Sequence, residues 1–344
     1  MPDHPIPDAA PPPAGIADAS FQDRVNERWY AAPLPRKELR ALMQRRDGPA
    51  LANFGLWIVL LVASGSLGVL TWGTWWAVPA FFVYGTLYSS SDARWHECGH
   101  GTVFRTPWLN ELFYQISSFM TLREAVLWRW SHTRHHTHTI ITGADPEIQV
   151  TRPADLLKIV LDFFNLVSGP PELLRIGRHA LGIISPDVAS FVPASERRKM
   201  IWSSRAYVAI IGGFAVWSVA IGSFLPMMFI ATPRFYAGWH HQLCGITQHA
   251  GLAENVRDHR LNTRTVYMNP VWRFLYMNMN YHIEHHMFPT VPYYALPALH
   301  QAVKPWMPAP YPSVLAAYRE IVPALIRQSR DASYFVRRTV PAAA

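Results

Sequence analysis

The chain has 344 residues, of which half are hydrophobic and only 16% are charged, and its net charge is +8. Soluble domains carry about 25% charged residues, so this composition indicates a membrane protein rather than an ordinary soluble domain. The basic residues lie beside apolar runs, which fits the cytoplasmic flanks of membrane spans better than a nucleic-acid-binding face, and we expect no nucleic-acid partner. Two cysteines, Cys98 and Cys244, provide no disulfide framework.

The two ends of the chain differ in composition from its centre. Residues 1–24 are rich in Pro and Ala and carry no secretory signal pattern, so we expect a disordered tail there. We expect the main domain over residues 25–322. The remainder, residues 323–344, is expected to form a basic C-terminal tail.

Two pairs of apolar segments are expected to form transmembrane hairpins. The first segment carries no charge and is long enough to cross a hydrocarbon layer of about 30 Å. The last segment is interrupted by Pro226, Pro233 and Arg234. A pair of buried helices in a soluble core is the alternative for the first hairpin. The four candidate spans are residues 51–72, 74–91, 205–222 and 224–243.

The orientation of these spans follows from the basic residues that precede the first one, since basic flanks stay in the cytoplasm. Two complete hairpins return the chain to its starting side, so both termini and all the histidine groups described next are expected to be cytoplasmic. If only one member of the second pair crossed the membrane, the last histidine group would lie on the opposite side.

Three groups of histidines repeat at helical spacing. One group is spaced four residues apart, and the other two share the spacing i, i+3, i+4. Residues three and four apart share a helix face, so each group presents its imidazoles in one direction. Eight imidazoles are too many for one metal ion and about right for two. They are His96, His100, His132, His135, His136, His282, His285 and His286.

The ligand type narrows the choice of metal. Imidazole nitrogen suits Zn, Cu, Fe and Ni, and two distant cysteines exclude a cysteine-rich structural zinc site. Two ions with open positions favour oxygen activation by iron, although zinc is also chemically possible. The segment from His96 to His100 satisfies the His-Glu-x-x-His pattern with Glu97 as base, so a zinc intramembrane protease is an alternative. That alternative leaves at least five histidines unexplained.

The three histidine boxes resemble those of the membrane fatty acid desaturase superfamily. Residues 280–292, followed by Leu-Pro-Ala-Leu-His300, closely resemble the third box of acyl-lipid-type desaturases. Residues 96–104 are similar to their first box, and Asp145-Pro146 falls where such proteins often carry Asp-Pro. The resemblance covers roughly residues 50–305.

This resemblance implies an all-α integral membrane bundle of about four spans, with a cytoplasmic helical cap that holds a di-iron centre. It implies a ninth histidine before the third box, for which His249 is the best candidate; His240 and His241 are expected in structural or substrate-channel roles. It also implies two iron ions, O₂ as co-substrate and an external electron donor of ferredoxin, rubredoxin or cytochrome b5 type with its reductase. The side chains expected to orient imidazole N–H groups are Glu97, Asp145, Asn280 and Glu284.

The reaction implied is desaturation of an unactivated C–C bond, with a fatty acyl or lipid substrate as the default for a site at a membrane surface. Hydroxylation or demethylation on the same centre is one alternative. Desaturation of a small polar molecule is another alternative. The first box and the Gln-His-Ala-Gly-Leu element resemble the dihydrorhizobitoxine desaturase branch as much as they resemble acyl desaturases. A long apolar tunnel would favour an acyl chain, and a short pocket lined with Arg or Asn would favour a small polar substrate.

Overall fold

The computed structural model describes residues 28–341, and within this range the chain is helical, with two isolated β-bridges and no strand. The all-α prediction is therefore confirmed for this part, while the tail predicted at residues 1–24 lies outside it. In chain order the helices are α2 Arg36–Leu42, α3 Asp47–Leu70, α4 Ala77–Ser89, α5 Ser91–Gly99, α6 Pro107–Met120, α7 Ala125–Thr137, α8 Leu156–Leu161, η1 Asp162–Phe164, α9 Gly169–Ala180, α10 Pro186–Phe191, α11 Ala194–Ala220, α12 Leu225–Phe229, α13 Pro233–Tyr236, α14 Trp239–His249, α15 His259–Asn262, α16 Pro270–Leu275, α17 His282–Met287, η2 Tyr293–Ala295, α18 Leu296–Val303, η3 Lys304–Trp306 and α19 Val314–Gln328.

Two helices of the described chain are long and apolar enough to cross a membrane, namely α3, continuous with the segment from Arg36, and α11. Both leave most of their apolar side chains outside the core, and Leu70 and Val219 are each 83% exposed. Trp75 and Trp76, in the turn after α3, are exposed as well. This pattern is typical of lipid-facing helices, since a buried core helix would cover these side chains.

The second and fourth predicted spans differ from the expectation. Residues 74–91 contain α4, which has 13 residues. Residues 224–243 do not form one helix, because they fold as α12, α13 and the start of α14. Pro226 and Pro233 each stand in the first turn of a new helix, where the missing N–H costs nothing. The candidate span at 224–243 is therefore broken at the prolines that were expected to interrupt it, and its crossing of the membrane stays a prediction.

The broken segment packs tightly against the first hairpin. A Cβ atom at Gly85 of α4 would lie 2.6 Å from the Cβ atom of Ala237, so only glycine allows this approach. The Tyr84 hydroxyl donates to the carbonyl of Phe229 at 3.2 Å, and their rings lie 5.0 Å apart. These contacts place Arg234 of α13 inside the protein, where it is 3% exposed.

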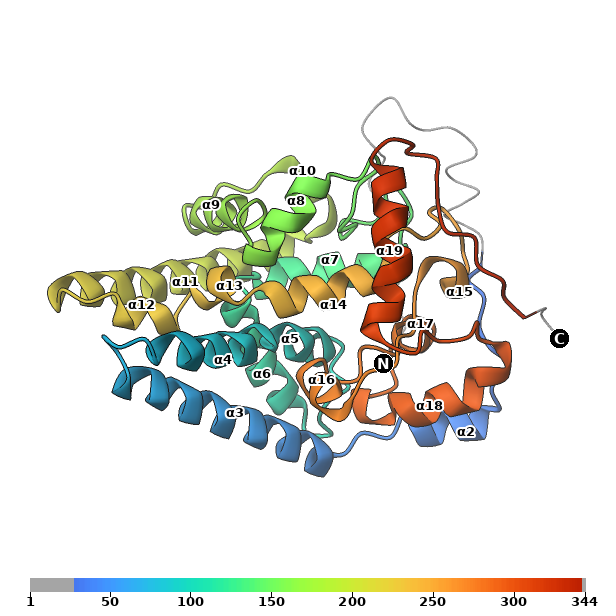
Figure 1. Ribbon diagram of the computed structural model, residues 1–344, viewed down its shortest axis with the longest axis horizontal. Coiled ribbons are helices and arrows are strands. Elements are labelled where there is room, and N and C mark those ends of the chain that lie inside the picture. The colour runs from blue at the N-terminus through green and yellow to red at the C-terminus, as the bar shows by residue number, and fades with distance from the viewer. Residues whose placement is uncertain (1–27, 342–344) are drawn as a thin grey trace.

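In Figure 1 the α3–α4 hairpin and the α11–α12 hairpin extend toward one end of the molecule, and α2, α18 and α19 lie at the other. Helices α5, α7 and α14 lie between these ends. The largest apolar core joins side chains of α4, α5 and α6 to residues 276–307, and includes Tyr88, Trp95 and Tyr293. Histidine groups that are distant in sequence are thereby brought together.

The C-terminal segment is more ordered than the predicted tail. The boundary expected after residue 322 falls inside α19, which continues through Pro323 and buries Leu325. Beyond α19, the backbone N–H of Val336 donates to the carbonyl of Gly251 at 2.9 Å. Arg338 Nη1 donates to the carbonyl of Thr263 at 2.7 Å. The described part of this segment therefore packs on the domain.

Candidate metal centre

All nine predicted histidines lie in one cluster formed by four helices. Within each of two groups, the possible ligand atoms lie within 4.8 Å of one another. His282 joins the smaller group, because its Nε2 lies 3.1 Å from Nε2 of His286. The first group contains His96, His100, His132, His136 and His285, and the second contains His135, His249 and His286.

The local helices account for this convergence. His96 lies on α5 and His100 caps its end, while His132 and His136 lie one turn apart on α7. The ring centroids of His96 and His100 are 5.0 Å apart, and those of His132 and His136 are 4.6 Å apart, as expected for residues on one helix face. His249 is the last residue of α14. The prediction that each group shares a face, and that His249 joins them, agrees with this geometry.

The hydrogen bonds of four rings show which nitrogen is free. The Nδ1 atoms of His96, His132 and His135 face carboxylates at 3.2, 2.9 and 2.8 Å. Nδ1 of His249 lies 2.9 Å from the carbonyl oxygen of Asn262. Because carboxylates and carbonyls accept hydrogen bonds, Nδ1 carries the proton in each ring and Nε2 is left with a bare lone pair.

These bare nitrogens fit metal ions. Nε2 of His132 lies 3.2 Å from Nε2 of His100 and 3.1 Å from Nε2 of His136. Nε2 of His96 and of His249 are buried and have no hydrogen-bond partner within residues 28–341. Several acceptor nitrogens that face one another in a buried space are unfavourable unless a cation lies among them. The donor set therefore fits the two ions predicted.

The protonation states also suit metal binding. Burial, together with the neighbouring imidazoles, holds the pKa of His96, His100 and His285 well below the ordinary value. Burial and the adjacent His135 lower the pKa of His249 to about 3. These rings are neutral at physiological pH, and the neutral form is the one that binds metals.

Three carboxylates orient the rings, and two of them were expected. Glu97 Oε1 lies 3.2 Å from His96 Nδ1 and 3.5 Å from His285 Nδ1. Asp145 pairs with His135. The third is Glu147, which pairs with His132 and was not predicted. Its only signal in the sequence is its position two residues after Asp145, in a loop whose course depends on tertiary packing.

Asn280 and Glu284 do not orient the predicted ligands. The Asn280 amide donates to the carbonyl of Val266 at 2.8 Å. Glu284 accepts hydrogen bonds from the Thr265 hydroxyl at 2.6 Å and from His300. The hydrogen bonds of both side chains go to residues other than the nine histidines, so both hold the base of α17 in place. The expectation that Asn280 and Glu284 orient imidazole N–H groups of the predicted ligands is therefore not met by their hydrogen bonds.

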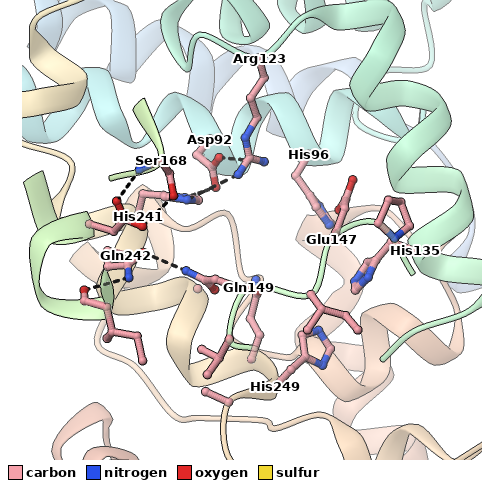
Figure 2. A pocket seen from close by; sticks show the side chains of 18 of the residues that line it. Asp92, His96, Arg123, His135, Glu147, Gln149, Ser168, His241, Gln242 and His249 are labelled. Atoms are coloured by element: carbon pink, nitrogen blue, oxygen red, sulfur yellow. Dashed lines mark hydrogen bonds and ion pairs between the residues drawn. The ribbon is translucent and has the colours of Figure 1, made fainter. Parts of the chain in front are cut away.

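A cavity of about 620 Å³ reaches the cluster, and five of the nine histidines line it. In Figure 2, His96, His135 and Glu147 lie on one side of this cavity, and Asp92, Arg123 and His241 lie together on another. A smaller cavity of about 360 Å³ reaches His100 and His136 from beside Tyr114 and Pro289. The five histidines that line the larger cavity are His96, His132, His135, His249 and His282.

Comparison with known families gives the same assignment as the histidine boxes. The family described as fatty acid desaturase matches residues 73–318, which is more than half of the chain. The chain belongs to the fatty acid desaturase family. It is therefore an oxidoreductase, and the family predicted from the boxes is confirmed.

Three similar proteins illustrate the relationship of this desaturase to others. An sn-1 acyl-lipid omega-3 desaturase (ferredoxin) of Synechocystis is 25% identical over 294 residues, covering 78% of this chain and 76% of the relative. An sn-1 oleoyl-lipid 12-desaturase of the same organism is 23% identical over 321 residues, with 86% and 85% coverage. A chloroplastic omega-3 fatty acid desaturase of Glycine max is 24% identical over 323 residues, with 86% and 66% coverage.

The desaturase family overturns the zinc protease alternative, and the position of Glu97 agrees. A protease base must reach the water that attacks the substrate. The Glu97 side chain is fully buried, contacts His96 and His285, and lines neither of the two cavities described above. Its surroundings raise the pKa of Glu97 to about 8 through burial.

Proposed function

We propose that the nine histidines hold two iron ions and that this desaturase uses O₂ to introduce a double bond into an aliphatic chain. The supporting observation is the pair of imidazole groups whose bare nitrogens face one another. In this proposal the first group holds one ion, and the second group together with His282 holds the other. When bound and reduced, such an iron pair supplies the O₂ activation that breaking an aliphatic C–H bond requires.

The balanced reaction is R–CH₂–CH₂–R′ + O₂ + 2 e⁻ + 2 H⁺ → R–CH=CH–R′ + 2 H₂O. The protein orients the histidine rings and excludes water from the site. Asp145 and Glu147 hold the Nδ1 protons of His135 and His132, which leaves their Nε2 atoms free. We further propose that the two electrons come from a ferredoxin or a similar external carrier, because three relatives carry ferredoxin in their names.

The proposed membrane arrangement places α3, α4, α11 and the α12–α13 segment in the lipid, with the histidines and both termini on the cytoplasmic side. Basic residues precede the apolar part of each long helix, as cytoplasmic flanks do. They are Arg36, Lys37, Arg40, Arg45 and Arg46 before the apolar part of α3, and Arg197, Arg198 and Lys199 at the start of α11.

Two substrate classes are compatible with this chemistry, and different observations support them. The relatives named above support an acyl lipid. The lining of the larger cavity, with Asp92, Arg123, Arg234 and Gln242, supports a polar molecule. Hydroxylation on the same centre differs from desaturation only in the product.

The test uses the full chain purified in detergent. We expect two irons per chain by elemental analysis, and O₂ consumption that depends on reduced ferredoxin and substrate. Mass spectrometry of the product should show the loss of two hydrogens, whereas the gain of one oxygen would identify a hydroxylase. A preparation that binds zinc in place of iron, and consumes no O₂ when loaded with iron, would overturn the proposal.

A further inference from the structure

Arg234 is a buried cation, and two of its three guanidinium nitrogens have no hydrogen-bonding partner within residues 28–341. It lies on α13, is 3% exposed and lines the cavity that reaches the histidines. Within residues 28–341, no acceptor forms a hydrogen bond with its Nε or Nη1 atoms. Asp92 and Glu172 attract it electrostatically, but neither forms an ion pair with it. A buried guanidinium with unmade hydrogen bonds is costly, so this position requires an acceptor that the protein itself does not supply.

A second arginine stands beside it in a rigid setting. The Arg123 guanidinium lies 4.4 Å from the ring centroids of both Trp95 and Trp128. Its Nη1 atom lies 3.3 Å from Asp92 Oδ1, and the other oxygen of Asp92 lies 2.7 Å from His241 Nδ1. Figure 2 shows Asp92, Arg123 and His241 together at the cavity wall. Arg123 is thus fixed by its aromatic contacts and its ion pair with Asp92, and it lies near enough to Arg234 for the two guanidinium groups to repel each other.

This cationic corner lies close to the metal centre. Asp92 and His96 are four residues apart on α5, so they occupy one helix face about 6 Å apart along the axis. Both side chains line the same cavity. A molecule with one end beside Arg234 therefore needs only a short aliphatic segment to bring its methylene groups beside His96.

The methylene run of an acyl chain does not suit this corner. Its methylene groups would displace water from Arg234, Asp92 and His241 and return no hydrogen bond, which is unfavourable. A carboxylate accepts two parallel hydrogen bonds from a guanidinium, the strongest arrangement available to arginine. Building on the proposed function, we propose that the substrate is an aliphatic carboxylate, with its carboxylate bound by Arg234 beside Arg123 and its methylene groups presented to the histidine cluster.

The test measures binding to the full, iron-loaded chain in detergent by isothermal titration calorimetry. The probes are hexanoate and hexanamide, which share a chain length and differ in charge. We expect hexanoate to bind at least about tenfold more tightly than hexanamide. Equal affinities for the two probes would overturn the proposal, and this comparison needs no variant to fold.

The variants separate a specific contact from a general positive field. Arg234→Gln should reduce the affinity for hexanoate to that for hexanamide, and Arg234→Lys should restore part of it. Arg175→Gln is the matched control, because Arg175 lines the same cavity but already pairs with Glu172 and Glu124. It changes the charge equally and should alter hexanoate affinity by less than about threefold. Equal losses in the two glutamine variants would contradict a subsite at Arg234.

Failure of the subsite and failure of the proposed function give different results. A chain that holds two irons but binds hexanoate no better than hexanamide refutes the subsite alone. A chain that binds hexanoate through Arg234 but holds no iron refutes the di-iron proposal alone. Displacement of hexanoate by palmitate would assign the subsite to long-chain acids, and lack of displacement would assign it to short ones; both results support carboxylate recognition at Arg234.

Discussion

The carboxylate of Glu147 lies 2.9 Å from Nδ1 of His132, and this contact fixes which nitrogen of His132 faces the cluster. Glu147→Ala should free the ring to rotate and to change tautomer. Loss of such a partner typically lowers metal affinity or activity by about 10–100-fold. Iron content at limiting free iron measures the effect, with Glu111→Ala as a control, since Glu111 pairs with Arg129 at the surface. Unchanged iron affinity in the Glu147 variant would refute this role.

Replacing a proposed ligand should separate metal binding from folding. His285→Ala should lower iron content and abolish O₂-dependent turnover, while membrane insertion and helical circular dichroism stay unchanged. The control is His138→Ala, because His138 lies just after the second box, partly exposed, and faces Arg257 instead of the cluster. A similar loss of iron in both variants would argue against a specific ligand set.

His179 tests the opposite case, a buried histidine that supports stability rather than metal binding. Its Nδ1 lies 2.7 Å from Glu124, whose side chain is fully buried. His179→Ala removes this partner, and breaking a buried pair costs roughly 3–5 kcal/mol. We expect a lower unfolding midpoint in a denaturant titration, with two irons per chain retained by the folded fraction. Loss of iron without loss of stability would contradict this assignment.

Gly85 should be essential for the contact between α4 and α13. Gly85→Val places side-chain atoms against Ala237 and Tyr236, and overpacking of this kind costs about 1–3 kcal/mol or more. Gly55→Val in α3 is the matched control, since nothing lies within 4 Å of a Cβ atom there. Thermal unfolding of the two variants should differ clearly. Equal midpoints would show that the α12–α13 segment does not need this close approach.

Acid should destabilise the cavity wall through Asp92. Burial alone would raise the pKa of Asp92, but Arg123 and His241 outweigh burial and hold this pKa well below its ordinary value. A depressed pKa in the folded state stabilises the fold above the unfolded pKa of about 3.9, and this contribution is lost as the pH falls below that value. Unfolding of Asp92→Asn should therefore depend less on pH between 4 and 2 than unfolding of the wild type. Identical pH profiles would contradict the prediction.

The local parts of the site were predictable from sequence, and the parts that depend on tertiary packing were not. Spacing alone places His132 and His136 on one face, because helix periodicity is a local property. Pro226 and Pro233 were expected to interrupt the candidate span at 224–243, but the sequence did not show that each would begin a new helix. Glu147 lies in a loop whose path is set by distant packing, so no periodic pattern marks it.

The final described stretch also has a practical consequence. Val336 and Arg338 hold the backbone at Gly251 and Thr263, on either side of the loop that carries Asn262, whose carbonyl oxygen accepts the hydrogen bond from His249. Shortening the chain at Ser329, or attaching a bulky purification tag that pulls this stretch away, would loosen the support of His249, one of the proposed iron ligands. An expression strategy for this enzyme should therefore keep that C-terminal extension intact and judge each fusion by its iron occupancy.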